Sequence, residues 1–62
     1  MQITVLDFSS GNVYVIPFDN NIYSNDNIQD FFDAVNEQHD LNLKESNCQW
    51  MIYKKTTITF LN

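Results

Sequence analysis

The sequence predicts a single α+β domain, residues 1–62, in which two strands, one helix and two further strands follow in that order. Three observations support this prediction. Apolar residues alternate with others near the start of the chain and again near its end, as in strands with one buried face. Between these regions, apolar residues recur at three- and four-residue spacing, as on the buried side of a helix. We therefore expect a four-stranded sheet with one helix on one face.

The first two strands are expected at residues 2–8 and 13–18, on either side of a turn that contains Gly11. A glycine at this point suits a type I turn followed by a left-handed residue and a bulge. Pro17 marks the second strand as an edge strand, because proline has no N–H for a further neighbour. With Phe8 opposite Asn12, one face of the hairpin carries Ile3, Val5, Val13 and Val15.

The helix is expected to follow an Asn- and Asp-rich loop, with Asp26 and Gln29 as its capping box, and to end near His39. After it, residues 50–53 and 57–61 are predicted strands, joined by a turn at 54–56. That turn lacks Gly and Asn, so one continuous strand is the alternative. The predicted helix buries Ile28, Phe31, Phe32 and Val35, and the hairpin places Trp50, Ile52, Ile58 and Phe60 on a single face.

This layout resembles the β-grasp fold of ubiquitin-like proteins and of small immunoglobulin-binding domains. The likeness rests on Met1-Gln2-Ile3 with Val5 at the start, and on Gln49-Trp50 through Thr56, Ile58 and Phe60 at the end. The resemblance implies a mixed sheet whose first and last strands are central and parallel. It transfers no activity, because the chain lacks a terminal Gly-Gly and its helix is acidic.

A second similarity, to short acidic proteins of phages and other bacterial mobile elements, concerns Asp7-Phe8-Ser9 and residues 47–51. It implies an origin and no activity.

Charge and cysteine content set aside several functions. The formal charge is −5, from eight acidic residues against three lysines, with no arginine. Direct binding to nucleic acid is not expected, since it depends on clustered Lys and Arg. One cysteine, Cys48, excludes an intrachain disulfide. The start of the chain lacks a signal-peptide pattern, and no apolar run is long enough to span a membrane, so a cytoplasmic protein without membrane contact is expected.

Reactive residues are few. Cys48 and His39 are the only candidate nucleophile and base, with Asp40 as a possible orienting acid, and their spacing gives no sign of proximity. Gly11 is the only glycine, so there is no phosphate-binding loop. Residues 19–21 lack the glycine and distal glutamate of a calcium loop. We therefore expect no enzyme, cofactor or metal site.

Two surfaces are candidate interaction sites. Five acidic residues, spaced four, three, four and three apart, fall within about 80° of one helix face. They are either a solvated face or a strip that docks on a basic partner protein, and docking is the leading prediction: Asp26, Asp30, Asp33, Glu37 and Asp40.

The second surface is the side of the sheet that the helix leaves bare. An apolar set remains there in either hairpin register, the valines being left out if the register is reversed, and such a set favours an interface over a partly solvated face. The alternative function is therefore assembly by self-association, as a homodimer, through Leu6, Tyr14, Ile16, Met51 and Tyr53.

Overall fold

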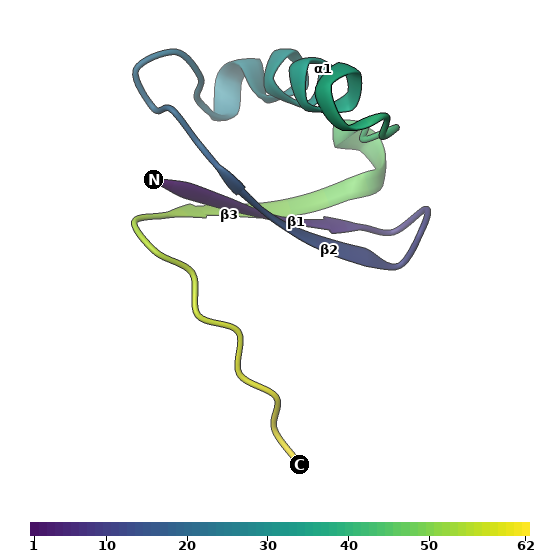
Figure 1. Ribbon diagram of the computed structural model, residues 1–62, viewed down its shortest axis with the longest axis vertical. Helices are drawn as coiled ribbons and strands as arrows, with labels where there is room; N and C mark the ends of the chain where they lie inside the picture. The colour runs from purple at the N-terminus through teal and green to yellow at the C-terminus, as the bar shows by residue number, and fades with distance from the viewer.

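The structure is a computed structural model that describes all 62 residues. Three antiparallel strands form its sheet, in the order β2-β1-β3, and one helix covers one face of that sheet (Figure 1). Short 3₁₀ turns precede the helix and the third strand. The elements are β1 (Gln2–Asp7), β2 (Asn12–Pro17), η1 (Asn25–Asn27), α1 (Ile28–His39), η2 (Glu45–Asn47) and β3 (Cys48–Tyr53).

The predicted four-stranded mixed sheet is wrong. No strand forms over residues 57–61, and no two strands are parallel. β3 pairs directly with β1, with Tyr53 opposite Gln2 and Cys48 opposite Asp7. It therefore occupies the place beside β1 that the β-grasp resemblance assigned to the last strand.

The length of α1 explains the direction of β3. Its 12 residues span about 18 Å at 1.5 Å per residue, close to the roughly 20 Å of a six-residue strand. The helix therefore returns the chain to the end of the sheet where β1 finishes. Only residues 40–47 then separate α1 from β3. A connection this short makes β3 begin at that end and run antiparallel to β1.

The path of the chain after β3 explains the missing fourth strand. Thr56 N donates a hydrogen bond to Gln2 Oε1 at 2.8 Å, and Thr4 Oγ1 donates one to Thr56 Oγ1 at 2.9 Å. Gln2 and Thr4 alternate with the buried Ile3 and point away from α1. Residues 54–56 thus cross from the edge of β3 onto the bare face of the sheet over β1. The rest of the chain, residues 57–62 (here the tail), then leaves the body of the protein (Figure 1).

The register of the first hairpin also differs from the prediction. Asp7, and not Phe8, lies opposite Asn12, so the loop has four residues. The Asp7 carboxylate accepts hydrogen bonds from Ser9 N (3.0 Å), Ser9 Oγ (2.7 Å) and Ser10 Oγ (2.8 Å), and starts the turn one residue early. Gly11 closes the loop at φ 75°, the left-handed conformation that was predicted. A shift of one residue in one strand turns every side chain of that strand to the other face.

Asp7 makes hairpin stability depend on pH. Hydrogen bonds from the Ser9 and Ser10 side chains hold the pKa of its carboxyl below the ordinary value of 3.8. Between the lowered pKa and the ordinary pKa, the unfolded state therefore binds more protons than the folded state. The carboxylate stabilises the folded state fully when the pH is above the ordinary pKa. We expect this stabilisation to be lost as the pH falls through the lowered pKa of the folded state.

Urea unfolding between about pH 5 and about pH 2 tests this linkage. The midpoint of Asp7→Asn should change less with pH than that of the wild type. Glu37→Gln, which removes a charge from an exposed helical position, corrects for the change in net charge. Equal pH dependence in wild type and Asp7→Asn would contradict the assignment.

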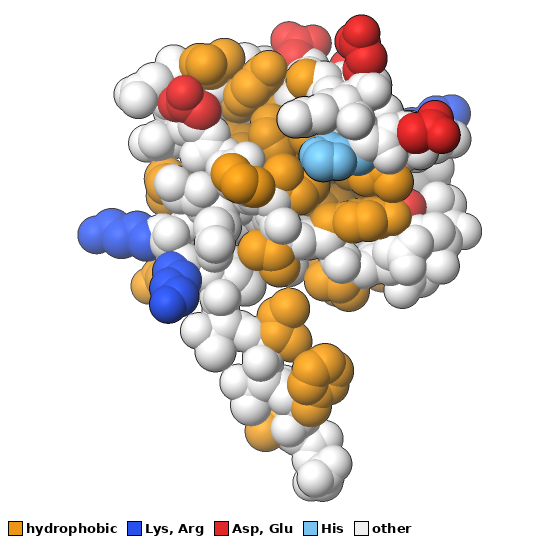
Figure 2. Space-filling model, in the orientation of Figure 1, with side chains coloured by type: hydrophobic (Ala, Val, Ile, Leu, Met, Phe, Trp, Pro, Cys, Tyr) orange, Lys and Arg blue, Asp and Glu red, His pale blue; other side chains and the backbone are white.

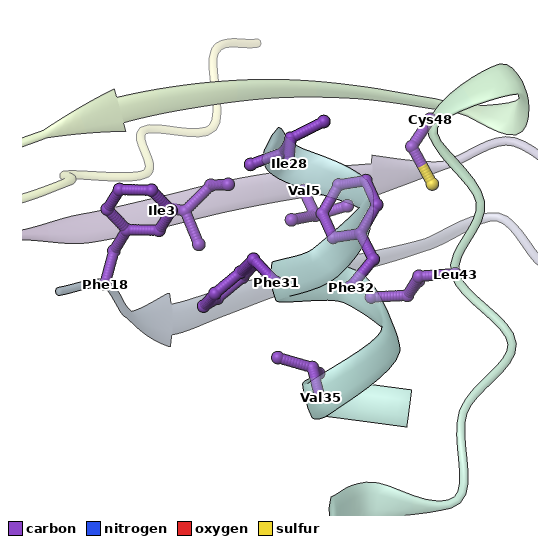
Figure 3. Packing of buried hydrophobic residues seen from close by; sticks show 9 residues of the cluster. All are labelled: Ile3, Val5, Phe18, Ile28, Phe31, Phe32, Val35, Leu43 and Cys48. Carbon is purple, nitrogen blue, oxygen red and sulfur yellow. The ribbon is translucent and has the colours of Figure 1, made fainter. Parts of the chain in front are cut away.

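The core lies between α1 and the sheet (Figure 3). The predicted stripe of α1 is confirmed: Ile28, Phe31, Phe32 and Val35 are all buried. The predicted end at His39 is also confirmed, whereas the capping box is formed two residues earlier, by Ser24 and Asn27 around η1. The stripe packs against the following residues from the sheet and loops: Ile3, Val5, Phe18, Leu43 and Cys48.

Leu43 is a core residue that the periodic pattern did not reveal. It lies in the connection between α1 and β3 and is fully buried. The Asn36 side chain pairs with its main chain at both ends: Leu43 N donates to Asn36 Oδ1 (2.7 Å), and Asn36 Nδ2 donates to Leu43 O (2.9 Å). A polar residue of α1 thus replaces the strand neighbour that a buried loop otherwise lacks.

Candidate functional site

The face of the sheet that points away from α1, here the open face, is largely apolar. All three strands contribute large side chains to it, with between 40% and 60% of each side chain exposed. Leu6 lies directly opposite Val13 in the β1–β2 ladder, so these two side chains are neighbours across the strands on the open face. The exposed apolar residues of the open face are Leu6, Val13, Val15, Met51 and Tyr53.

Two of the residues predicted for this face lie elsewhere. Tyr14 and Ile16 pack against the core on the side of α1, because the register of β2 is shifted by one residue. Val13 and Val15 take their places on the open face, as expected for the reversed hairpin register. Leu6, Met51 and Tyr53 lie on the open face as predicted.

The five acidic residues do not form one continuous helical row. Asp30, Asp33 and Glu37 share an exposed face of α1, within about 60° of one another. Asp26 belongs to η1, and Asp40 follows the end of the helix at φ 54°. The carboxylates lie over α1, on the opposite side of the molecule from the open face (Figure 2).

The row on α1 has little neutralisation from within the helix. Neither η1 nor α1 contains a lysine or arginine. The one side-chain hydrogen bond to the row comes from Gln29 Nε2, which donates to Asp33 Oδ1 at 2.9 Å. His39, in the last turn, is the only basic type of residue in α1.

A groove separates α1 from the free edge of β2. Two adjoining hollows of about 420 and 480 Å³ make up this β2–α1 groove, and six of the eight residues around the first are hydrophobic. The groove exists because no strand lies beyond β2 to fill the space beneath the overhanging helix. Figure 2 shows hydrophobic side chains around the only histidine in this region. Both hollows are lined by Ile16, Pro17, Val35 and His39.

Cys48 and His39 occupy different environments. Cys48 is a free thiol within the core, and burial raises the pKa of that thiol. A thiol in such a place is a weak nucleophile, since the thiolate is the reactive form. His39 is exposed at the end of α1 and borders the β2–α1 groove.

No group of three or more His, Cys, Asp or Glu side chains is placed to hold a metal ion. The only α-helix, α1, is too short and too polar to cross a membrane. Neither a protein-family model, nor a curated protein, nor a solved structure matches the chain.

Proposed function

We propose that this chain is a non-enzymatic protein-interaction module that self-associates through the open face of its sheet. The observation that carries the proposal is the gathering of Leu6, Val13, Val15, Met51 and Tyr53 on one exposed surface. Isolated apolar residues are normal on protein surfaces, whereas contiguous apolar patches mark interfaces. The single buried thiol and the charge of −5 support a cytoplasmic location and argue against direct nucleic-acid binding.

A lysine at an exposed position of the open face tests the proposal. Met51 is half exposed on β3 and is not part of the buried core. Met51→Lys should therefore fold normally, but it removes apolar contact and places like charges across a symmetric interface. We expect wild type to sediment as a dimer at micromolar concentration and Met51→Lys to sediment as a monomer.

Met51→Leu is the matched control and should stay dimeric. Ile16→Lys is unsuitable for this test, because Ile16 packs against the core on the side of α1. A lysine there would destabilise the fold and not only the association. A wild-type chain that remains monomeric up to millimolar concentration would contradict the proposal.

A second candidate function is docking of the acidic face of α1 on a basic partner protein. It is favoured by the exposure of Asp30, Asp33 and Glu37 on one side of a helix that has no lysine. Because the carboxylates and the open face lie on opposite sides of the molecule, one copy could use both surfaces at once (Figure 2). Like charges at such spacing cost a few tenths of a kcal/mol per pair, and a basic partner would relieve that cost.

Neutralising the row separates docking from simple solvation. The triple variant Asp30→Asn, Asp33→Asn, Glu37→Gln should fold at least as stably as wild type, because repulsion within α1 falls. If the row docks on a basic partner, the variant should lose binding to that partner, and wild-type association should slow steeply with added salt. A partner is obtained by pull-down with mass spectrometry. Unchanged affinity at low and physiological salt would show that the row is only solvated.

A further inference from the structure

We propose that the β2–α1 groove binds residues 57–61 of a second copy as an added strand beside β2. The proposal rests on the self-association proposed above and specifies how a second copy is held. The added strand would restore a fourth strand to the sheet, supplied between chains and at the opposite edge from β3. Such strand addition obtains its affinity from main-chain hydrogen bonds and its specificity from side chains that enter a pocket on one face.

The edge of β2 offers main-chain groups for this pairing. Phe18 N donates to Met1 O at 2.9 Å, so the main-chain groups of Phe18 point towards β1. Along a strand, the main-chain groups of successive residues point alternately to one neighbour and to the other. Val15 and Val13, an odd number of residues away, therefore turn their N–H and C=O groups to the free edge. Pro17 also faces that edge and has no N–H to leave unpaired.

The groove beneath that edge suits large apolar side chains. Its walls come mainly from β2 and α1, with Tyr23 and Leu41 from the adjoining loops. The other side of the helix is closed, because the Trp50 ring packs on Phe32 at 5.5 Å and its Nε1 donates to Asn25 Oδ1 at 3.0 Å. The groove therefore distinguishes the β2 edge from the β3 edge. Its main lining residues are Tyr14, Ile16, Ala34, Val35, His39 and Leu41.

The tail has the composition of a strand without a partner. Residues 57–61 read Thr-Ile-Thr-Phe-Leu, all of them residues without charge and most of them β-branched or aromatic. Phe60 is 91% exposed and Leu61 90% exposed, which is unfavourable for side chains of this size. In an added strand, Ile58 and Phe60 would point to the same face and enter the groove, while Leu61 would point to the other face.

The tail of the same copy cannot fill the groove in this way. Thr56 is held over β1 by Gln2 and Thr4, and a strand beyond β2 lies about 10 Å from β1, two strand spacings away. At about 3.3 Å per residue, crossing that distance uses residues 57–59. Ile58 would then lie in the crossing segment and outside the groove, so only a second copy can supply both Ile58 and Phe60.

The direction and area of the interface also favour a second copy. Thr56 lies on the open face, so two copies packed through that face would each direct a tail towards the other. Three strands of six residues cover only about 300 Å² in projection, whereas a stable interface buries about 800 Å² per partner. The exchanged tails would provide much of the difference.

Two neighbouring tail residues provide a matched test in the full chain. Phe60 and Leu61 are equally exposed in one copy, so a hydrophobic tail without defined geometry would be weakened similarly by either change. Strand addition predicts that Phe60→Ser raises the dimer dissociation constant roughly 30-fold or more, as for a buried anchor residue. Strand addition gives Leu61 no place in the groove, so Leu61→Ser should raise the dissociation constant by a clearly smaller factor than Phe60→Ser does. Equal effects would overturn the proposal.

A mixed sample locates the tail directly. Isotope-labelled and unlabelled copies are combined, and isotope-filtered NOEs are recorded between copies. We expect NOEs from the Phe60 ring of one copy to Ala34 and Val35 of the other. The same NOEs found only within one copy would assign the groove to its own tail, and their absence from both would leave it unoccupied. Either result would overturn the proposal.

The variants also separate this proposal from the proposed function. If Met51→Lys dissociates the dimer while Phe60→Ser does not, the open face is the interface and strand addition is wrong. If Phe60→Ser dissociates the dimer while Met51→Lys does not, strand addition stands and the open face is not required.

Discussion

Replacing Phe32 with alanine is expected to lower the free energy of unfolding by about 3–5 kcal/mol. Phe32 is completely buried at the centre of the core, with its ring edge-on to Trp50 at 5.5 Å and tilted against Phe31 at 6.1 Å. Its removal loses the transfer free energy of the ring and leaves a cavity that the surrounding side chains fill only in part. A domain of this length has a total stability of about 3–9 kcal/mol, so the substitution should remove a large part of it.

Circular dichroism and urea titration measure this effect. Phe8→Ala is the matched control, because Phe8 has the same side chain but is 67% exposed in the first hairpin loop. Its free energy of unfolding should change only as much as for a surface substitution, by about 0.5 kcal/mol or less. If the two variants unfolded at similar urea concentrations, α1 would not pack on the sheet as described.

Asn36→Ala is expected to destabilise the protein by about 2–3 kcal/mol. The substitution removes both hydrogen bonds to the Leu43 main chain, at 2.7 and 2.9 Å. Leu43 O keeps a longer bond of 3.4 Å from Gln29 Nε2, whereas Leu43 N is left without that partner. The gain in helix propensity from Asn to Ala, a few tenths of a kcal/mol, offsets only part of the loss.

Two further substitutions give this prediction a scale. Asn36→Asp keeps an acceptor for Leu43 N but loses the donor to Leu43 O, so its stability should be intermediate. Gln38→Ala, at an exposed position of the same helix, should have little effect. A loss in Asn36→Ala no greater than in Gln38→Ala would show that the loop after α1 is held by the burial of Leu43 alone.

The features that depended on local patterns were predictable. Ile28, Phe31, Phe32 and Val35 repeat at the period of a helix, and the structure buries all four. Trp50 and Ile52 were expected on one face, and both pack against the core. Such patterns can be recognised in a sequence because the buried residues of a helix or a strand recur with the period of that element.

The register of the first hairpin was not predictable from alternation alone. Moving one strand by one residue leaves the alternating pattern unchanged and exchanges its two faces. The choice depends on the Asp7 carboxylate, whose three hydrogen bonds to Ser9 and Ser10 begin the turn. The pattern did not distinguish this arrangement from a turn that begins after Phe8. Tyr14 and Ile16 were consequently assigned to the wrong face.

The candidate site was also predictable only in part. The acidic face of α1 followed from spacing, as far as Asp30, Asp33 and Glu37 are concerned. The β2–α1 groove did not, because it is a space between elements that are distant along the chain. It exists only because the sheet ends at β2 while the helix extends over that edge.

The sequence by itself determined the helix, its buried face, the first three strands and the excess of negative charge, since these follow from residue type and local spacing. The tertiary structure decided which side of β2 is buried, where β3 pairs, and that residues 57–61 form no strand. The last point depends on hydrogen bonds that join Thr56 to Gln2 and Thr4, more than 50 residues away. A strand of suitable composition forms only where the edge of a neighbouring strand is within reach. These bonds direct the tail away from the free edge of β2 in its own copy.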